Sequence, residues 1–330
     1  MTRAGSGSVG LVIVTLLGYQ IPNFTYQGVA PAQLFDVVKG QAVEAESSGF
    51  DTVLVMDHFY QLAQLGRPEQ EMIECYTLLS ALAQHTSRVR LSALVTGNTY
   101  RAPALLAKTV TALDVVSGGR AQLGIGAGWF ELEHDSLGFE FGTFTDRFER
   151  LEEALQIIIP MLRGERPSLD GKWYRVKDAI NNPAPLARIP IMIGGGGEKK
   201  TLRMVAQYAD ESNIICAAGE IGRKLEALAG HCAALGRDRS EITVSYQTSV
   251  CIAPTHEQAI ADLDAHIARQ PEAAPRRDSV ITGNPDEVAE QYAALLATGV
   301  DGVTVSMSSV GHIEGRVALL GEALAPLFKR

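Results

Sequence analysis

Short hydrophobic runs recur along the whole chain, and longer amphipathic stretches lie between them. Most of these runs are nearly continuous and rich in β-branched residues, which is typical of strands that are buried on both faces. We predict strands at 18–22, 51–56, 89–95, 121–125, 191–193, 212–216, 242–251 and 301–307. We predict helices at 33–48, 71–85, 102–116, 146–162, 198–208, 221–235, 255–268, 285–298 and 312–328.

Eight predicted strands that alternate with helices favour an α/β fold, namely a single closed (β/α)8 TIM barrel, over two doubly wound halves. The sequence Gly-Phe-Asp-Thr-Val at 49–53 returns as Gly-Val-Asp-Gly-Val at 299–303, as expected of repeated βα units. No Pro/Gly/Ser-rich linker divides the chain. We therefore expect one barrel domain over residues 1–330, with residues 1–15 as an N-terminal extension.

The length beyond a minimal barrel falls mainly in two insertions, near 164–189 and 269–284. In the first, Asp170-Gly171 stands between two short extended segments and predicts a hairpin. The second contains Pro271, Pro275 and two arginines, and we expect a mobile loop there. Helix ends are marked by glycines that follow four predicted helices, at Gly49, Gly164, Gly236 and Gly299.

The composition excludes several classes of protein. Hydrophobic residues make up 46% of the 330 positions and charged residues 20%, so the chain can fill a core and is not disordered. A net charge of −9 without a run of Lys or Arg argues against nucleic acid or an anionic membrane as partner. The apolar run at 9–17 is too short to span a bilayer. Four scattered cysteines form no zinc pattern, and we expect a reduced, cytoplasmic protein without a metal.

Candidate chemistry follows the predicted strands, because barrel sites form at the carboxyl ends of the strands. Asp57 and His58 follow the second strand and are well placed for proton transfer, although a helix cap beside a structural histidine would look the same. After the third strand, Gly97 and Asn98 tolerate unusual backbone angles and would let a ligand approach closely; an ordinary turn is the alternative. Trp129 ends a glycine-rich segment after the fourth strand.

A run of four glycines after the fifth strand predicts an anion site. Gly194, Gly195, Gly196 and Gly197 precede a helix start, so free amides and the helix dipole would face one point. A merely flexible loop is the alternative. After the sixth strand, the small-residue segment Cys216, Ala217 and Ala218 would lie beside this run in a barrel. A phosphate cradle on one side of the mouth and an Asp-His pair on the other suit a long phosphorylated heterocycle of the flavin type.

At this point several long motifs, in order, resemble the luciferase-like monooxygenase superfamily, in its actinobacterial branch that uses the deazaflavin coenzyme F420. The motifs are Val55-Met56-Asp57-His58-Phe59, the runs 95–108 and 113–120, the segment 124–129 with Glu133-His134, and the run 193–202 with Ala209-Asp210. The resemblance extends from about Gly18 to Leu327. It implies a barrel of the bacterial-luciferase type, a small-molecule substrate and a homodimer.

The resemblance also implies roles for individual residues. His58 resembles the histidine that handles the proton in hydride transfer, and Asp57 resembles the aspartate that contacts the polar end of the deazaflavin. The cofactor contacts implied are Asp57, Leu94, Val95, Thr96, Gly97, Asn98, Gly194, Gly195, Gly196, Gly197, Cys216, Ala217 and Ala218. In the family, the strand end that matches 94–97 forms a bulge, often with a non-prolyl cis peptide bond.

The substrate is less readable than the cofactor. We expect Phe24, Tyr60 and Trp129 to line the substrate pocket. The family's sugar-phosphate dehydrogenases carry a catalytic glutamate where Trp129 aligns, so we expect a substrate other than glucose 6-phosphate, apolar or planar. Two other functions stay open: a luciferase-like monooxygenase that uses reduced FMN and oxygen, and an inactive homologue that binds the cofactor only.

Overall fold

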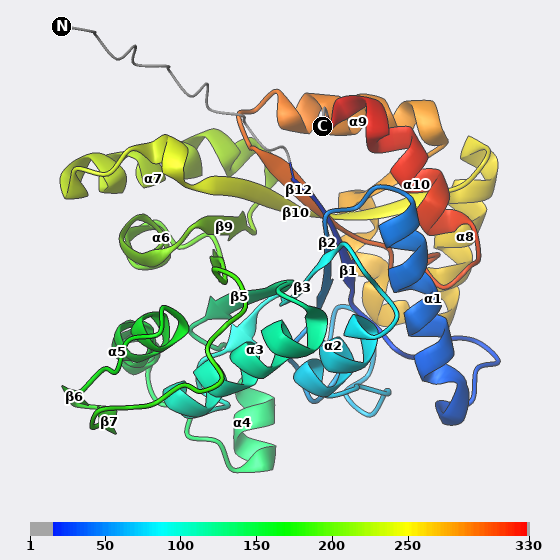
Figure 1. Cartoon of the computed structure of the whole chain (residues 1–330). Coiled ribbons are helices and arrows are strands. Elements are labelled where there is room, and N and C mark those ends of the chain that lie inside the picture. The colour runs from blue at the N-terminus through cyan, green and yellow to red at the C-terminus, as the bar shows by residue number, and fades with distance from the viewer. Residues whose placement is uncertain (1–15, 329–330) are drawn as a thin grey trace, which may run out of the picture.

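In the computed structural model, which describes residues 16–328, eight parallel strands close a barrel (Figure 1). The barrel strands are β1 (Leu16–Ile21), β2 (Thr52–Val55), β3 (Arg90–Ala93), β5 (Ala121–Gly126), β8 (Ile191–Gly194), β9 (Glu211–Ile214), β10 (Thr243–Ile252) and β12 (Gly302–Ser306). They pair in chain order, and β12 closes the ring on β1 with Leu17 opposite Val303. The predicted (β/α)8 barrel is therefore confirmed.

Helices lie between the strands and surround the barrel, as Figure 1 shows. They are α1 (Leu34–Ser47), α2 (Cys75–Ala83), α3 (Pro103–Ser117), α4 (Glu131–Leu137), α5 (Phe144–Leu162), α6 (Thr201–Tyr208), α7 (Ile221–Leu235), α8 (His256–Arg269), α9 (Pro285–Leu296) and α10 (Arg316–Leu324). Short 3-10 helices are η1 (Pro31–Gln33), η2 (Ala218–Glu220), η3 (Arg239–Glu241), η4 (Pro271–Ser279) and η5 (Ala325–Leu327). The predicted extension at 1–15 lies outside the described residues.

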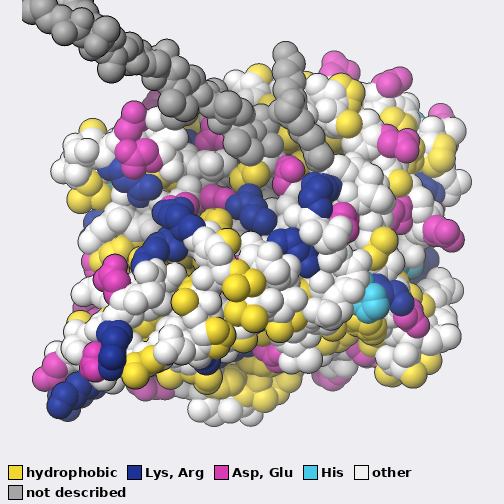
Figure 2. Space-filling model, viewed as in Figure 1, with side chains coloured by type: hydrophobic (Ala, Val, Ile, Leu, Met, Phe, Trp, Pro, Cys, Tyr) yellow, Lys and Arg dark blue, Asp and Glu magenta, His cyan; other side chains and the backbone are white. Residues whose placement is uncertain are grey.

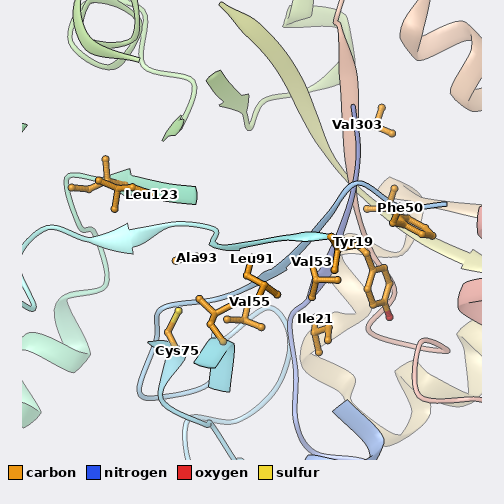
Figure 3. Packing of buried hydrophobic residues seen from close by; sticks show 14 of the residues in the cluster. Tyr19, Ile21, Phe50, Val53, Val55, Cys75, Leu91, Ala93, Leu123 and Val303 are labelled. Atoms are coloured by element: carbon orange, nitrogen blue, oxygen red, sulfur yellow. The ribbon is translucent and has the colours of Figure 1, made fainter. Parts of the chain in front are cut away.

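The main hydrophobic core lies between the barrel and its helices. Alternate residues of a strand point to opposite faces, and on β1 the outward Tyr19 is fully buried in this layer. Its ring meets the edge of Phe50 at 5.5 Å between ring centroids (Figure 3). The intervening Gln20 points into the barrel, where its amide receives a hydrogen bond from Gln247 at 2.7 Å. The wall of the barrel is thus apolar outside and partly polar inside.

The expectation of a mobile loop at 269–284 is wrong. Residues Pro271–Ser279 form η4, and Val280–Gly283 form strand β11, which pairs in parallel with Ser249 to Ile252 of β10. The reason is the length of β10, which has ten residues and uses its first part for its barrel neighbours. Its last residues then offer a free edge that β11 covers.

The predicted hairpin in the first insertion forms, but with a longer turn. The strands β6 (Leu169–Asp170) and β7 (Arg175–Val176) are antiparallel, so Asp170 belongs to a strand and residues 171–174 form the turn. The carboxylate of Glu153 on α5 accepts hydrogen bonds at 2.9 to 3.0 Å from the backbone N–H groups of residues 172–174. A contact with a distant helix therefore determines this turn.

Several helix starts also differ from the prediction. Helix α2 begins at Cys75 rather than at residue 71, because the Glu74 side chain accepts a hydrogen bond from the Thr77 amide and caps it. Helices α6 and α10 begin three and four residues after their predicted starts, and α4 was not predicted. The glycine stops are confirmed, since Gly49, Gly164, Gly236 and Gly299 all have positive φ angles, between 66° and 97°.

Candidate active site

Asp57 lies just after β2 and is almost fully buried, at 2% exposure. The guanidinium of Arg101 donates to both carboxylate oxygens, at 2.7 and 3.0 Å, and the Gly97 amide donates to one of them at 3.2 Å. Burial raises the pKa of Asp57 above its usual range, while the Arg101 charge opposes that shift. Arg101 also pairs with Glu74 at 2.6 Å. The role that the structure gives Asp57 is to tie the end of β2 to the segment after β3.

His58 is held by a buried carboxylate. Its Nδ1 atom lies 2.9 Å from Glu133 Oε2, and Glu133 has no exposed surface. The same carboxylate accepts hydrogen bonds from the amide of Tyr60, at 2.9 Å, and from the hydroxyl of Tyr100. Burial alone would raise the pKa of Glu133, but hydrogen bonds from His58 and Tyr100 hold it below its usual range.

The other ring nitrogen of His58, Nε2, has no hydrogen-bond partner within residues 16–328, and 12% of the side chain is exposed. A carboxylate on Nδ1 favours the tautomer or imidazolium with a proton on Nδ1, so Nε2 is left to exchange a proton with a bound molecule. This is the geometry of a general acid or base with a carboxylate behind it.

The segment after β3 forms the predicted bulge. The peptide bond between Leu94 and Val95 is cis. The strand predicted at 89–95 ends at Ala93 as β3, and a second short strand, β4 (Thr96–Gly97), follows the bulge. A Cβ on Gly126 would lie 2.9 Å from Val95, and one on Gly194 would lie 2.7 Å from it. Both neighbouring strands therefore need glycine where they meet this bulge.

Thr96 and Asn98, at the end of the bulge, are also buried. The Thr96 hydroxyl is 2.6 Å from the hydroxyl of Tyr76. Asn98 donates to the hydroxyl of Tyr174, on the hairpin insertion, at 3.4 Å, and its Oδ1 atom is buried without a partner in the described part of the chain. A buried acceptor of this kind is costly unless a donor reaches it, so Asn98 is suited to contact a ligand.

The glycine run lies beside the loop after β9, as predicted. A Cβ on Gly196 would lie 2.6 Å from the Ile215 carbonyl oxygen and 3.8 Å from Cys216 Cβ, so the two loops touch. The amides of Gly196 and Gly197 donate to no acceptor within residues 16–328, and Gly195 has a φ of 120°. Free amides in a loop before a helix can hold a phosphate.

Two cations that reach the segment after the glycines are paired with an acid. Glu198, directly after the glycines, pairs with Lys224 at 2.8 Å and with Arg223. Ala217 precedes the short helix η2 and Ala218 begins it, so both lie at the mouth next to Cys216. The cradle therefore offers backbone amides to a phosphate, and Lys199 and Lys200 lie in the turn directly after Glu198.

The structure brings most of the predicted site residues into one continuous line. Contacts run from Asp57 to Gly97, along the bulge to Val95, and from there to Gly194 and the loop after β9. Trp129 lies beside His58, with ring centroids 5.7 Å apart. Tyr60 lies two residues after His58 in the segment that follows β2.

Phe24 is the exception among the predicted pocket residues. It has no exposed surface and packs within the main core, so it offers no face to a substrate in this structure. The prediction that Phe24 lines the pocket is therefore not supported. The Phe24 side chain packs in the hydrophobic core instead.

Sequence reasoning missed Glu133, Arg101 and Tyr100 as partners of the site. Glu133 and Arg101 stand inside motifs that carry the family resemblance, but no spacing rule links them to His58 or Asp57. Glu133 lies on α4, which local patterns did not predict. In the sequence, Glu133 stands among other charged residues, at 131–135, and nothing distinguishes it from them.

Fold and site together place the chain among the (β/α)8 barrel enzymes with their chemistry at the carboxyl ends of the strands. The model of the luciferase-like monooxygenase family matches residues 16–302. The chain therefore belongs to the luciferase-like monooxygenase family, as the sequence motifs indicated.

Two similar curated proteins share one description. An F420-dependent glucose-6-phosphate dehydrogenase of Microbacterium testaceum is 31% identical over 236 residues, which cover 70% of this chain and 67% of that protein. A protein of Nocardia farcinica with the same description is 27% identical, over 90% of this chain and 94% of its own length.

Solved structures show the same fold at low sequence identity. An F420-dependent secondary alcohol dehydrogenase in complex with an F420–acetone adduct has a TM-score of 0.79 at 18% identity, over 96% of this chain and 99% of its own. The F420-dependent tetrahydromethanopterin reductase of Methanopyrus kandleri has a TM-score of 0.75 at 19% identity, with the same coverage.

Proposed function

We propose that this protein is an oxidoreductase that transfers a hydride between coenzyme F420 and a small organic substrate. The observation that carries the proposal is His58, which follows β2. Its Nδ1 is held by the buried Glu133, while Nε2 has no partner among residues 16–328. The F420-dependent descriptions of the relatives support the deazaflavin as the cofactor. When bound, the deazaflavin supplies or accepts the hydride at a ring carbon.

The residues of the mouth fit such a cofactor. The unpartnered Oδ1 of Asn98 is a candidate acceptor for a ring N–H, and the bulge at Leu94–Val95 would back the ring. The free amides of Gly196 and Gly197 would hold the phosphate. Contacts of Val95 with Gly194 join these two regions, so one elongated molecule can reach both.

His58 would move the proton that accompanies the hydride. In the reductive direction, its Nε2 delivers a proton to the substrate; in the oxidative direction, Nε2 takes the proton of an alcohol. The buried carboxylate of Glu133 holds the imidazole through Nδ1, so Nε2 is the nitrogen left for proton exchange in either direction.

The test is a pair of titrations, with oxidised F420 and with FMN, followed by turnover of His58→Ala. We expect tight F420 binding, weak or no FMN binding, and a loss of at least about 100-fold in turnover for the variant with an F420 dissociation constant changed less than threefold. FMN binding without F420 binding would instead support the monooxygenase. F420 binding without hydride transfer to any acceptor of a broad panel would support the inactive homologue.

We also propose that the protein is a homodimer. Helix α3 presents exposed apolar side chains, among them Leu105 at 58% and Val116 at 47% exposure. Leu186, at 62%, lies near the C-terminal end of α3, because its amide donates to Asp114 of that helix. Figure 2 shows hydrophobic side chains gathered where Figure 1 places α3. An exposed apolar face of this kind is typical of an interface between proteins, and a second copy of the chain would remove it from water.

A further inference from the structure

We propose that the substrate end of this site takes an uncharged, planar molecule with an activated C=C or C=O bond, rather than a sugar phosphate. The inference rests on the proposed hydride transfer and adds the class of substrate to it. Three independent features of the residues around His58 carry it: an aromatic wall, a fully engaged carboxylate and paired cations.

The aromatic wall is made by Trp129 and Phe130. Their rings stack at 5.3 Å between centroids with 27° between the planes, and each meets His58 at 5.7 Å in an edge-on arrangement. Trp129 is 57% exposed, so a broad indole surface is open beside the imidazole. A flat apolar surface next to the proton donor favours a flat apolar partner, since aromatic faces gain by stacking and by burial.

A second group of aromatic rings lies next to Glu133, the carboxylate that holds His58. Phe59 lies 5.1 Å from Tyr100 and 5.6 Å from Phe139 between ring centroids. His134, buried at 1% exposure, packs 5.0 Å from Tyr100. The surroundings of His58 are therefore apolar and closely packed, which disfavours a strongly hydrated substrate.

The carboxylate nearest to His58 is not available to a sugar. Glu133 has no exposed surface, and its oxygens already accept from His58, Tyr60 and Tyr100. Sugar recognition usually needs free polar groups aimed at the hydroxyls, and substrate hydroxyls left without partners would be costly to bury.

The two arginines that contact the segments around His58 and Trp129 already have hydrogen-bond partners. Arg101 is bound by the carboxylates of Asp57 and Glu74. Arg147 donates to the carbonyl oxygens of Gly128 and Gly142 and stacks over the ring of Phe141 at 3.8 Å. A phosphate or carboxylate on the substrate would have to take one of these cations from its present partners.

The reaction balances as a two-electron reduction. The substrate's C=C or C=O bond accepts a hydride from the reduced deazaflavin at one atom and a proton from His58 Nε2 at the other. The double bond becomes single, the substrate gains two electrons and two hydrogens, and the cofactor loses one hydride. His58 then regains its proton from the solvent.

The test compares two probes on the F420-loaded protein: coumarin, a planar uncharged lactone with an activated C=C bond, with reduced F420, and glucose 6-phosphate with oxidised F420. We expect oxidation of the reduced cofactor by coumarin and no reduction of the oxidised cofactor by the sugar phosphate. Reduction of F420 by glucose 6-phosphate, with coumarin unreactive, would overturn the inference.

Two variants of Trp129 test whether the aromatic wall causes the preference for a planar substrate. We expect Trp129→Glu to lower kcat/KM for coumarin at least tenfold, and Trp129→Phe, which keeps an aromatic face, to lose less. Trp173→Phe is the matched control, because Trp173 is the other tryptophan of the chain and lies on the hairpin turn, where it contacts Glu149 and Arg150. Unchanged coumarin kinetics in Trp129→Glu would contradict the role of the wall. F420 affinity is measured for every variant, so failure of cofactor binding would point to the proposed function and not to this inference.

Discussion

At the scale of single residues, the site depends on two side-chain pairs that join distant parts of the chain. His58 is held by Glu133, 75 positions away, and Asp57 by Arg101, 44 positions away. In each pair one member follows β2 and the other follows a later strand. Removing one member of a buried pair leaves the other charge without compensation, which is strongly destabilising. Both pairs therefore couple the geometry of the site to the stability of the mouth.

Glu133→Gln tests the positioning of His58. Glutamine keeps the shape but removes the charge, so we expect turnover to fall about 10- to 100-fold while the F420 dissociation constant changes little. Steady-state kinetics and cofactor titration separate the two effects, because a merely structural role would weaken both together.

Glu131→Gln is the matched control for that experiment. Glu131 lies two residues earlier on α4 and is exposed, so we expect wild-type kinetics. A Glu133→Gln protein with normal turnover and normal melting temperature would show that His58 does not need the carboxylate.

At the scale of elements, close contacts between loops explain residue choices that looked functional in the sequence. In the sequence, the run Gly194–Gly197 predicts an anion site. In the structure, Gly194 is also required for packing, because a Cβ there would lie 2.7 Å from Val95. Gly196 is limited in the same way by the Ile215 carbonyl. Ligand binding and packing thus both require glycine in this loop. A run of glycines in the sequence therefore does not show which of the two requirements it meets.

The exposed face of α3 makes a prediction about assembly. We expect the protein to elute with twice the 35.4 kDa mass of the chain in light scattering, and a Leu105→Glu/Val116→Glu variant to elute as a monomer. Charges placed in an apolar interface cost several kcal/mol of association free energy. Leu235→Glu, at a similarly exposed position at the end of α7, is the control and should remain a dimer. A wild-type monomer at micromolar concentration would refute the proposal.

At the scale of the whole molecule, the second insertion lies against a buried histidine of α8. His266, at the end of α8, is 8% exposed, and its Nε2 atom is buried without a partner in the described chain. Burial, with the nearby charges of Arg269 and His312, lowers the pKa of His266 to about 4. Burial and Arg269 also lower the pKa of His312. The native fold therefore favours neutral imidazoles in this region.

This burial predicts a pH dependence of stability. Since the pKa of His266 is about 4 in the fold and 6.5 without its surroundings, the unfolded chain takes up the proton first as the pH falls. Its contribution is fully present above pH 6.5 and is lost on the way to pH 4, up to about 3 kcal/mol in the free energy of unfolding.

Urea unfolding at several pH values measures the effect. We expect His266→Leu to reduce the slope of stability against pH between 4 and 6.5. Equal slopes for wild type and His266→Leu would contradict the assignment.

Local patterns were sufficient to predict the barrel and the places where the site lies. Continuous apolar runs are characteristic of buried parallel strands, and chemistry in such a barrel follows the strands, so Asp57, His58, Gly97 and the glycine run could be found from the sequence. The partners of these residues depend on contacts between segments that lie far apart in the chain. Glu133 beneath His58, Glu153 at the hairpin turn and β11 on the free edge of β10 arise only when the closed barrel brings those segments together.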